Sequence, residues 1–119
     1  MPQESGNVNA HLEAVIEIRF VEGETFECVV DTGFDGALIL PASVVQSPNL
    51  PTVARLAFEL VGGARMTADV ALGEIEWLGQ RHTVEVILSE SDDALIGTEM
   101  LDGATLVIDY ADRSVTITR

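Results

Sequence analysis

Residues 11–21 alternate between polar and apolar side chains. Successive side chains of an extended chain point to opposite faces, so this alternation predicts a strand with one buried face. The apolar face consists of Leu12, Ala14, Ile16, Ile18 and Phe20. A half-buried strand is therefore the first element that the fold has to accommodate.

Short apolar segments separated by turn residues continue along the rest of the chain. We expect further strands at 26–30, 37–40, 52–60, 65–72, 74–78, 82–88, 94–96, 104–110 and 115–118. Gly62 and Gly63 suit the tip of a hairpin between two of these strands. Helical turns are expected at 41–46 and at 98–101, where Thr98 is the predicted N-cap. Many short strands with little helix predict an all-β fold, either a small barrel or a sandwich.

The composition is that of one globular domain. The chain has 119 residues and is 47% hydrophobic, which is enough for a single core. Residues 1–8 carry no periodic pattern and are predicted to be a flexible N-terminal tail. Residues 9–119 are predicted to form the domain, since no linker interrupts them.

Charge and cysteine content limit which partners the protein is expected to bind and in which compartment we expect it. Twenty acidic residues against six arginines give a formal net charge of -14. We therefore expect no nucleic-acid partner and no membrane binding, whereas cationic peptides would be attracted. No apolar run reaches the ~20 residues of a membrane helix, and we expect no signal peptide. The lone Cys28 excludes an intramolecular disulfide, which favours a cytoplasmic location, and its mid-strand position indicates a small buried hydrophobe.

An acidic turn interrupts two apolar strands. The segment 26–30 runs into Asp31, Thr32 and Gly33 before the second strand begins at Ala37. Ionised carboxylates are costly to remove from water, so an acid in this position is a candidate functional group. The Thr32 hydroxyl can hold neighbouring backbone, and Gly33 permits a tight turn and a close approach. A polar loop with Asp31 as a turn former is the alternative interpretation.

Three motifs in chain order carry a family resemblance. They are Asp31-Thr32-Gly33, the Gly62-Gly63 tip, and Leu95-Ile96-Gly97 before a helical turn. In this order they resemble the retropepsin-like aspartic proteases, the family of retroviral proteases and their single-domain bacterial relatives. The resemblance runs from about Leu12 to the last residue. It implies a small closed β-barrel of the retroviral-type acid protease fold, with one or two short helical turns.

The same resemblance implies roles for individual residues. Asp31 would be the catalytic carboxylate of each chain, Thr32 would bond across a dimer axis, and Gly33 would bind the substrate backbone. Phe34 and Asp35 would line the substrate cleft. The hairpin that carries Gly62 and Gly63 would be a flap over that cleft. Leu95, Ile96 and Gly97 would support the Asp31 turn from behind, and neither a cofactor nor a metal is implied.

Two positions depart from the retroviral pattern. Phe34 stands where retroviral members usually have alanine. Thr98 fills the place of an arginine that pairs with an acid near the active site, so we expect Asp35 to lack an ionic partner. Both departures concern the shape of the substrate pocket more than the chemistry.

The chemistry requires two carboxylates. Two carboxylates about 3 Å apart share one proton, so one can act as a base toward water while the other polarises the carbonyl group. The chain has a single Asp-Thr-Gly, and Asp102-Gly103 lacks the intervening hydroxyl. A second catalytic Asp must then come from a second chain. The sequence thus predicts an aspartic endopeptidase that acts on peptide or protein substrates as a homodimer.

Other interpretations remain open at this level. The protein could be a non-catalytic module of the same fold that binds peptides or dimerises, or a plain all-β domain in which Asp31 is a turn residue. His11 and His82 are far apart in sequence and predict surface histidines rather than metal ligands. Asp92 and Asp93 lack the ligand spacing of a calcium loop and predict a solvated loop.

Overall fold

The computed structural model describes residues 2–43, 52–59 and 62–119. The elements in chain order are β1 (Gln3–Val8), β2 (Ala14–Phe20), β3 (Thr25–Val30), β4 (Leu38–Pro41), β5 (Thr52–Glu59), β6 (Arg65–Trp77), β7 (Gln80–Ser89), β8 (Leu95–Ile96), η1 (Thr98–Leu101), β9 (Thr105–Asp109) and β10 (Ser114–Thr118). The only helical element in these ranges is the 3-10 turn η1. The predicted all-β architecture with a short helical turn is confirmed.

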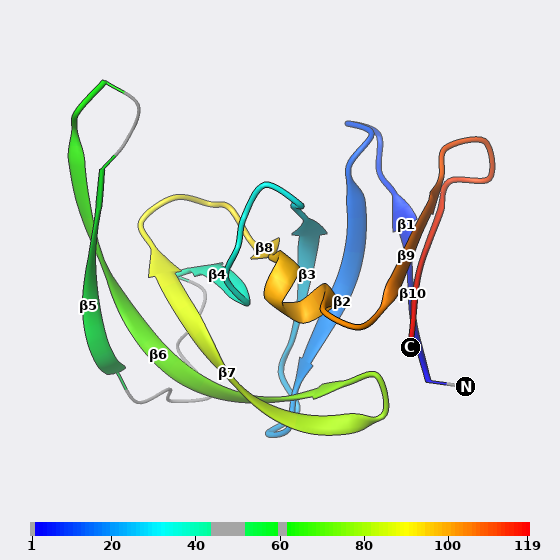
Figure 1. The fold of residues 1–119 in the computed structure, drawn as a ribbon, viewed down its shortest axis with the longest axis horizontal. Helices are drawn as coiled ribbons and strands as arrows, with labels where there is room; N and C mark the ends of the chain where they lie inside the picture. Colours follow the sequence, from blue (N-terminus) through cyan, green and yellow to red (C-terminus); the bar gives the residue numbers. More distant parts are fainter. Residues whose placement is uncertain (1, 44–51, 60–61) are drawn as a thin grey trace.

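The strands form one sheet that closes on itself (Figure 1). Their order across the sheet is β5, β6, β7, β4, β8, β3, β2, β1, β10 and β9, and a further pairing joins β6 to β2. That pairing closes β6, β7, β4, β8, β3 and β2 into a ring, which is the predicted small barrel. β5 extends the ring on one side in a long hairpin with β6, and β1, β10 and β9 extend it on the other side.

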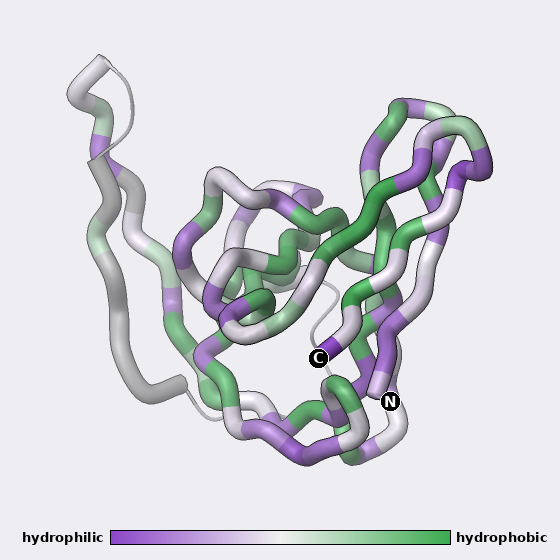
Figure 2. The backbone as a smooth tube through the Cα atoms, turned by 45° about the vertical axis from the view of Figure 1, so that its right-hand side comes forward, coloured by the Kyte–Doolittle hydropathy of each residue, from purple (hydrophilic) through white to green (hydrophobic). Residues whose placement is uncertain are grey.

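β2 supplies one wall of the core, as its alternating sequence predicts. The side chains of Ala14, Ile16, Ile18 and Phe20 are all buried. Other strands of the ring complete the core with Leu38, Leu40, Ile75, Val86 and Ile96. Apolar and polar residues alternate along much of the backbone in Figure 2. Leu12 departs from the prediction, because it precedes β2 in a turn with φ of 63° and is 59% exposed.

The predicted flexible tail is wrong for residues 3–8. Gln3–Val8 forms β1, which pairs with β2 on one side and with β10 on the other. Its side chains are mostly polar, so backbone hydrogen bonds to two neighbours hold it rather than an apolar face. Gly6 allows the close approach, since a Cβ at this position would overlap the carbonyl oxygen of Val15. The pairing also brings the two ends of the described chain together (Figures 1 and 2).

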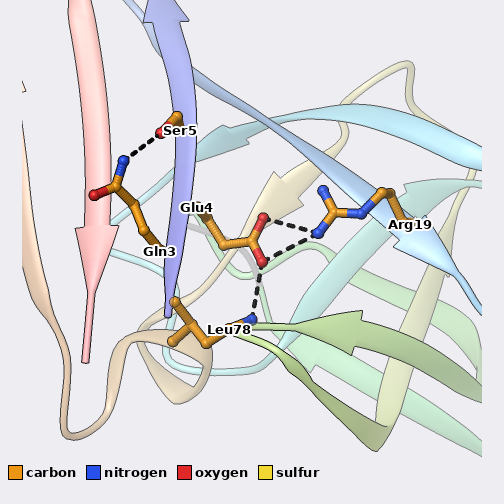
Figure 3. A network of polar contacts seen from close by, with 5 residues as sticks. All are labelled: Gln3, Glu4, Ser5, Arg19 and Leu78. Atoms are coloured by element: carbon orange, nitrogen blue, oxygen red, sulfur yellow. Dashed lines mark hydrogen bonds and ion pairs between the residues drawn. The ribbon is translucent and has the colours of Figure 1, made fainter. Parts of the chain in front are cut away.

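A buried carboxylate fastens β1 to the barrel (Figure 3). Glu4 is 4% exposed, and its Oε1 and Oε2 atoms accept hydrogen bonds of 3.1 and 3.2 Å from Nη2 of Arg19 on β2. Its Oε2 also accepts a 2.9 Å hydrogen bond from the backbone N–H of Leu78, in the turn between β6 and β7. Both oxygens are thus satisfied, as a buried charge requires. One side chain ties three separate segments together.

Three further local predictions are wrong. The segments 65–72 and 74–78 form one strand, β6, which ends at Trp77 and pairs with β7 without a break from Asp69 onward; Gly73 lies inside it, where the Phe20 ring packs in place of a side chain. Thr98 is not the N-cap of η1; Gly97 is, without a side-chain cap hydrogen bond. Pro41 ends β4 rather than beginning a helical turn, and residues 44–46 of that predicted turn lie outside the described residues.

Candidate active site

Asp31 lies at the end of β3, in a loop fixed by its own hydrogen bonds. The backbone N–H of Asp31 donates to the carbonyl oxygen of Ile96 at 2.9 Å, and the N–H of Phe34 donates back to the carbonyl of Asp31 at 3.2 Å. The side-chain Oδ1 of Asp31 accepts a 2.8 Å hydrogen bond from the N–H of Gly33. Oδ2 has no partner in the described parts of the chain. The loop therefore fixes the direction of the carboxylate and leaves one oxygen available.

β8 lies directly behind this loop. It is parallel to β3, with Leu95 opposite Val29, and antiparallel to β4, with Ile96 opposite Leu38. The two strands that enter and leave the Asp31 turn are thus joined through a third strand rather than to each other. This arrangement gives the turn a backbone scaffold.

Gly97 continues the scaffold by close packing. Its N–H donates to the carbonyl of Ala37 at 2.8 Å, and the N–H of Thr98 donates to the carbonyl of Phe34 at 2.8 Å. A Cβ on Gly97 would overlap the carbonyl oxygen of Gly36 and stand 2.6 Å from Cδ2 of Phe34. The φ of Gly97 is -94°, so space rather than backbone conformation requires glycine here.

The two departures from the retroviral pattern have visible consequences. The half-buried ring of Phe34 packs over Gly36 and Gly97 and fills the space between the loop and η1. Asp35 is exposed and forms no ion pair within the described residues. The bulky Phe34 ring thus supplies the packing volume at this position.

A shallow depression of about 360 Å³ opens beside the carboxylate. Asp31 and Thr32 line it together with Leu12, Ile108 and Tyr110. Leu12 is 59% exposed and Tyr110 is 57% exposed. Sequence reasoning assigned Leu12 to a buried strand face and gave Tyr110 no role. The topology brings them to Asp31, and no local pattern in the sequence signals this.

The structure does not bring every predicted site residue to this place. Asp31, Thr32, Gly33, Phe34 and Asp35 share one loop, and Leu95, Ile96 and Gly97 lie behind it. Gly62 and Gly63 are exposed, with φ of 99° and 86°, in the hairpin that projects away from the barrel (Figure 1). Residues 60 and 61 of the predicted flap lie outside the described residues.

Cys28 is buried next to this region and takes no part in it. Burial raises the pKa of the Cys28 thiol from 9.0 to about 12, because the thiolate would lose its water. A thiol that stays protonated is a poor nucleophile. The interpretation of Cys28 as a small buried hydrophobe is confirmed.

Two other kinds of feature, a metal site and a membrane-spanning helix, are absent from the described residues. In the described ranges, no three His, Cys, Asp or Glu residues are arranged to hold a metal ion. No helix in those ranges has the length and apolarity to cross a membrane.

Among the comparisons with known proteins, the solved structures show the fold of this chain. No family model matches the sequence. An uncharacterized protein from Archaeoglobus fulgidus is 26% identical over 112 residues, which cover 87% of this chain and 84% of that protein. A crystal structure of a retropepsin-like aspartic protease from Rickettsia conorii superposes with a TM-score of 0.65 and 18% identity, covering 97% of this chain and 92% of that one.

A viral protease also has a similar structure. The solution structure of the Simian Foamy Virus (mac) protease matches with a TM-score of 0.52 and 17% identity, covering 86% of this chain and 92% of the viral chain. Both matches span nearly the whole length of the solved proteins. The chain therefore has the retropepsin-like fold, as the sequence motifs predicted.

Proposed function

We propose that this protein is an aspartic endopeptidase, active as a homodimer in which each chain supplies one Asp31. The observation that carries the proposal is the setting of this residue. Its backbone is fixed by β8, its Oδ1 is oriented by Gly33, and its Oδ2 is unpartnered among the described residues. The surrounding fold is that of two solved aspartic or retroviral proteases.

The surroundings of Asp31 support a second copy as the partner. Leu12, Tyr110 and Val107 on β9 are the exposed large hydrophobic residues of the described chain, and the first two line the depression beside Asp31. Exposed apolar residues that gather in one place mark interaction surfaces. Because β1 and β10 pair with each other within one chain, we do not place these terminal strands in the interface. The interface proposed here therefore uses Leu12 and Tyr110 beside the Asp31 loop.

In this dimer the two Asp31 carboxylates share one proton. The ionised carboxylate takes a proton from water as the water oxygen bonds to the peptide carbonyl carbon, and the protonated one gives its proton to the carbonyl oxygen. The tetrahedral intermediate then collapses: the amide nitrogen takes the proton from the first carboxyl group as the C–N bond breaks, and one hydroxyl of the intermediate gives its proton to the second carboxylate. An amine and a carboxylic acid leave, and the pair is again singly protonated.

The remaining predicted residues act around this step. Thr32 bonds to the partner's loop, Gly33 offers its backbone to an extended peptide, and Phe34 and Asp35 shape the cleft. The hairpin that carries Gly62 and Gly63 closes over the bound peptide and excludes water. The single buried cysteine suits work in a reducing compartment such as the cytoplasm.

Mixing wild-type protein with the Asp31→Asn variant tests the dimer and the chemistry together. If each active site needs two Asp31 residues, wild-type homodimers make up about a quarter of all dimers in an equal mixture at fixed total concentration. We expect cleavage of a quenched fluorescent peptide library to fall to about a quarter of the undiluted wild-type rate. A monomeric enzyme would retain half of that rate and would contradict the proposal.

Asp102→Asn is the matched control, because it removes the same charge at an exposed position outside the Asp31 loop. Mixtures with this variant should retain the full rate. Sedimentation of each protein reports the dimer directly. A wild-type dimer that binds peptides but cleaves none of them, at any pH, would instead indicate a binding module.

A further inference from the structure

A second cavity lies on another part of the molecule and shares no lining residue with the Asp31 depression. It measures about 450 Å³ and lies between β7, η1 and Arg119. Its walls include Trp77, His82, Val84, Glu85, Glu99 and Arg119. The peptide hydrolysis proposed above uses none of them.

The cavity runs along an edge of β7. Four consecutive residues, 82–85, line it. Consecutive residues of a strand point to opposite faces, so a cavity that touches all four must meet the edge of the strand. On the side away from β6, β7 pairs with β4 only from Val86 to Ser89. In the described chain, residues 82–85 pair with β6 alone. This edge therefore offers unpaired backbone donors and acceptors to the cavity.

The walls of the cavity are apolar at the base and acidic at the rim. Trp77 is 2% exposed and donates from Nε1 to the carbonyl of Met100 at 3.0 Å, which fixes the apolar base. The exposed residues Glu85 on β7 and Glu99 on η1 stand on two sides of the rim. Arg119 already donates from Nη2 to the carbonyl of Asp102 at 2.9 Å. The two carboxylates thus favour a cationic group at the rim.

His82 gives this region a polar atom whose hydrogen-bonding capacity is not satisfied. Its Nε2 is the one buried side-chain nitrogen or oxygen without a hydrogen-bond partner in the described residues. A buried polar atom without a partner destabilises the fold. The same ring lines the cavity, so a turn of the ring toward the cavity would bring a nitrogen within reach of a ligand.

We propose that this cavity binds an extended segment of a basic polypeptide, which adds as a strand to the free edge of β7 at residues 82–85. Strand addition pairs the open backbone groups and places alternate side chains on either side of the added strand. An apolar side chain would reach Trp77 and Val84, and a basic one would reach Glu85 and Glu99. The net charge of -14 attracts such a peptide. The inference does not rest on the proposed hydrolysis.

Trp77 provides the measurement, because it is the only tryptophan and lines the cavity. The full chain carrying Asp31→Asn, which prevents cleavage, is titrated with a capped pentapeptide of alternating valine and arginine. The matched probe alternates valine and glutamate. We expect the basic peptide to change the Trp77 emission in a saturable way and to shift the backbone amide resonances of Thr83 and Glu85. The acidic peptide should do neither.

A pair of double variants tests the rim. Glu85→Gln with Glu99→Gln should weaken the basic peptide roughly fivefold, since two partly exposed ion pairs are lost. Glu74→Gln with Glu76→Gln removes the same charge from exposed positions outside this cavity and should leave the affinity within about twofold. Equal losses in both double variants would overturn the proposal. So would binding of neither peptide, equal binding of both, amide shifts confined to the Asp31 face, or self-association through the β7 edge.

Discussion

Two carboxylates in this molecule, Glu4 and Asp31, differ in how they are held. Glu4 is almost fully buried, and both of its oxygens are satisfied by Arg19 and by the Leu78 backbone. Asp31 is partly exposed and accepts one hydrogen bond, from Gly33 in its own loop. A carboxylate whose bonds all close within the chain holds segments together. One that is oriented by its loop but keeps a free oxygen can still bond to a group outside the chain.

The largest expected effect separates activity from stability at Asp31. Asp31→Asn keeps the shape of the side chain and its bond from Gly33 but removes the acid and the base of the proposed pair. We expect peptide cleavage to fall by about a thousandfold or more, with the melting temperature unchanged within a degree or two. Steady-state kinetics and thermal denaturation of the same preparation measure both. An active variant would show that Asp31 is a turn residue.

The Glu4 network should respond in the opposite way. Arg19→Ala leaves a buried carboxylate without its cation and should destabilise the fold by about 3 kcal/mol, whereas Glu4→Gln keeps an oxygen for Leu78 and should cost about 2 kcal/mol. Urea denaturation of both single variants and of the double variant gives the coupling between the partners. The folded fraction of each variant should cleave peptide at the wild-type rate. A lowered rate would mean that the two carboxylates are not independent.

Gly97→Ala should change both activity and stability, the two properties that the Asp31 and Glu4 variants are expected to separate. The added methyl group would overlap the Gly36 carbonyl behind the Asp31 loop, so we expect about 2 kcal/mol of lost stability together with lost activity. Gly63→Ala is the control: it has open space around it and only an unfavourable positive φ, worth about 1 kcal/mol. Denaturation and cleavage assays should show a larger loss of stability at Gly97. Equal losses would mean that the loop can yield.

The smallest expected effect is the pH dependence of stability that the buried Cys28 thiol causes. The folded-state pKa of Cys28 is about 12, above the value of 9.0 for an accessible thiol. Above pH 9 the unfolded chain loses this proton while the folded chain keeps it, so stability falls as pH rises from about 9 to 12. Denaturation at pH 8, 9 and 10 should show a decline that reaches about 1 kcal/mol per pH unit and is absent from Cys28→Ala. A decline of the same size in that variant would assign it to other groups.

Period-two hydropathy made the strands predictable, and the family resemblance favoured a closed barrel over a sandwich. Ala14–Phe20 has its apolar residues on one face, and the structure buries that face. The acidic turn between two apolar strands placed Asp31 at a strand end, where it lies. The support from β8 was predicted only through the family resemblance, because a two-residue strand carries no periodic signal.

The elements that sequence reasoning missed are mostly those set by distant contacts. β1 has no apolar alternation, and its place between β2 and β10 depends on backbone pairing and on Glu4. Gly73 looked like a break between two strands, yet it serves the Phe20 ring from another strand. Leu12 fitted the alternation of β2 but turns outward with a positive φ. For β1 and Gly73 the deciding contact involves residues from another part of the chain, whereas the turn that carries Leu12 is held by nearby Asn9, whose carbonyl accepts a 3.0 Å hydrogen bond from the N–H of Leu12.

The position of β1 also has a consequence for how quickly the chain can fold. Its partners in β10 include Thr118 opposite Gln3, so the pair closes a loop of nearly the whole described chain. Such non-local pairing raises the contact order, which slows folding. Until β10 arrives, the hairpin of β1 and β2 presents an open strand edge to any neighbouring chain. Joining the adjacent ends and opening the chain elsewhere would make that pairing local and speed the search for the native state.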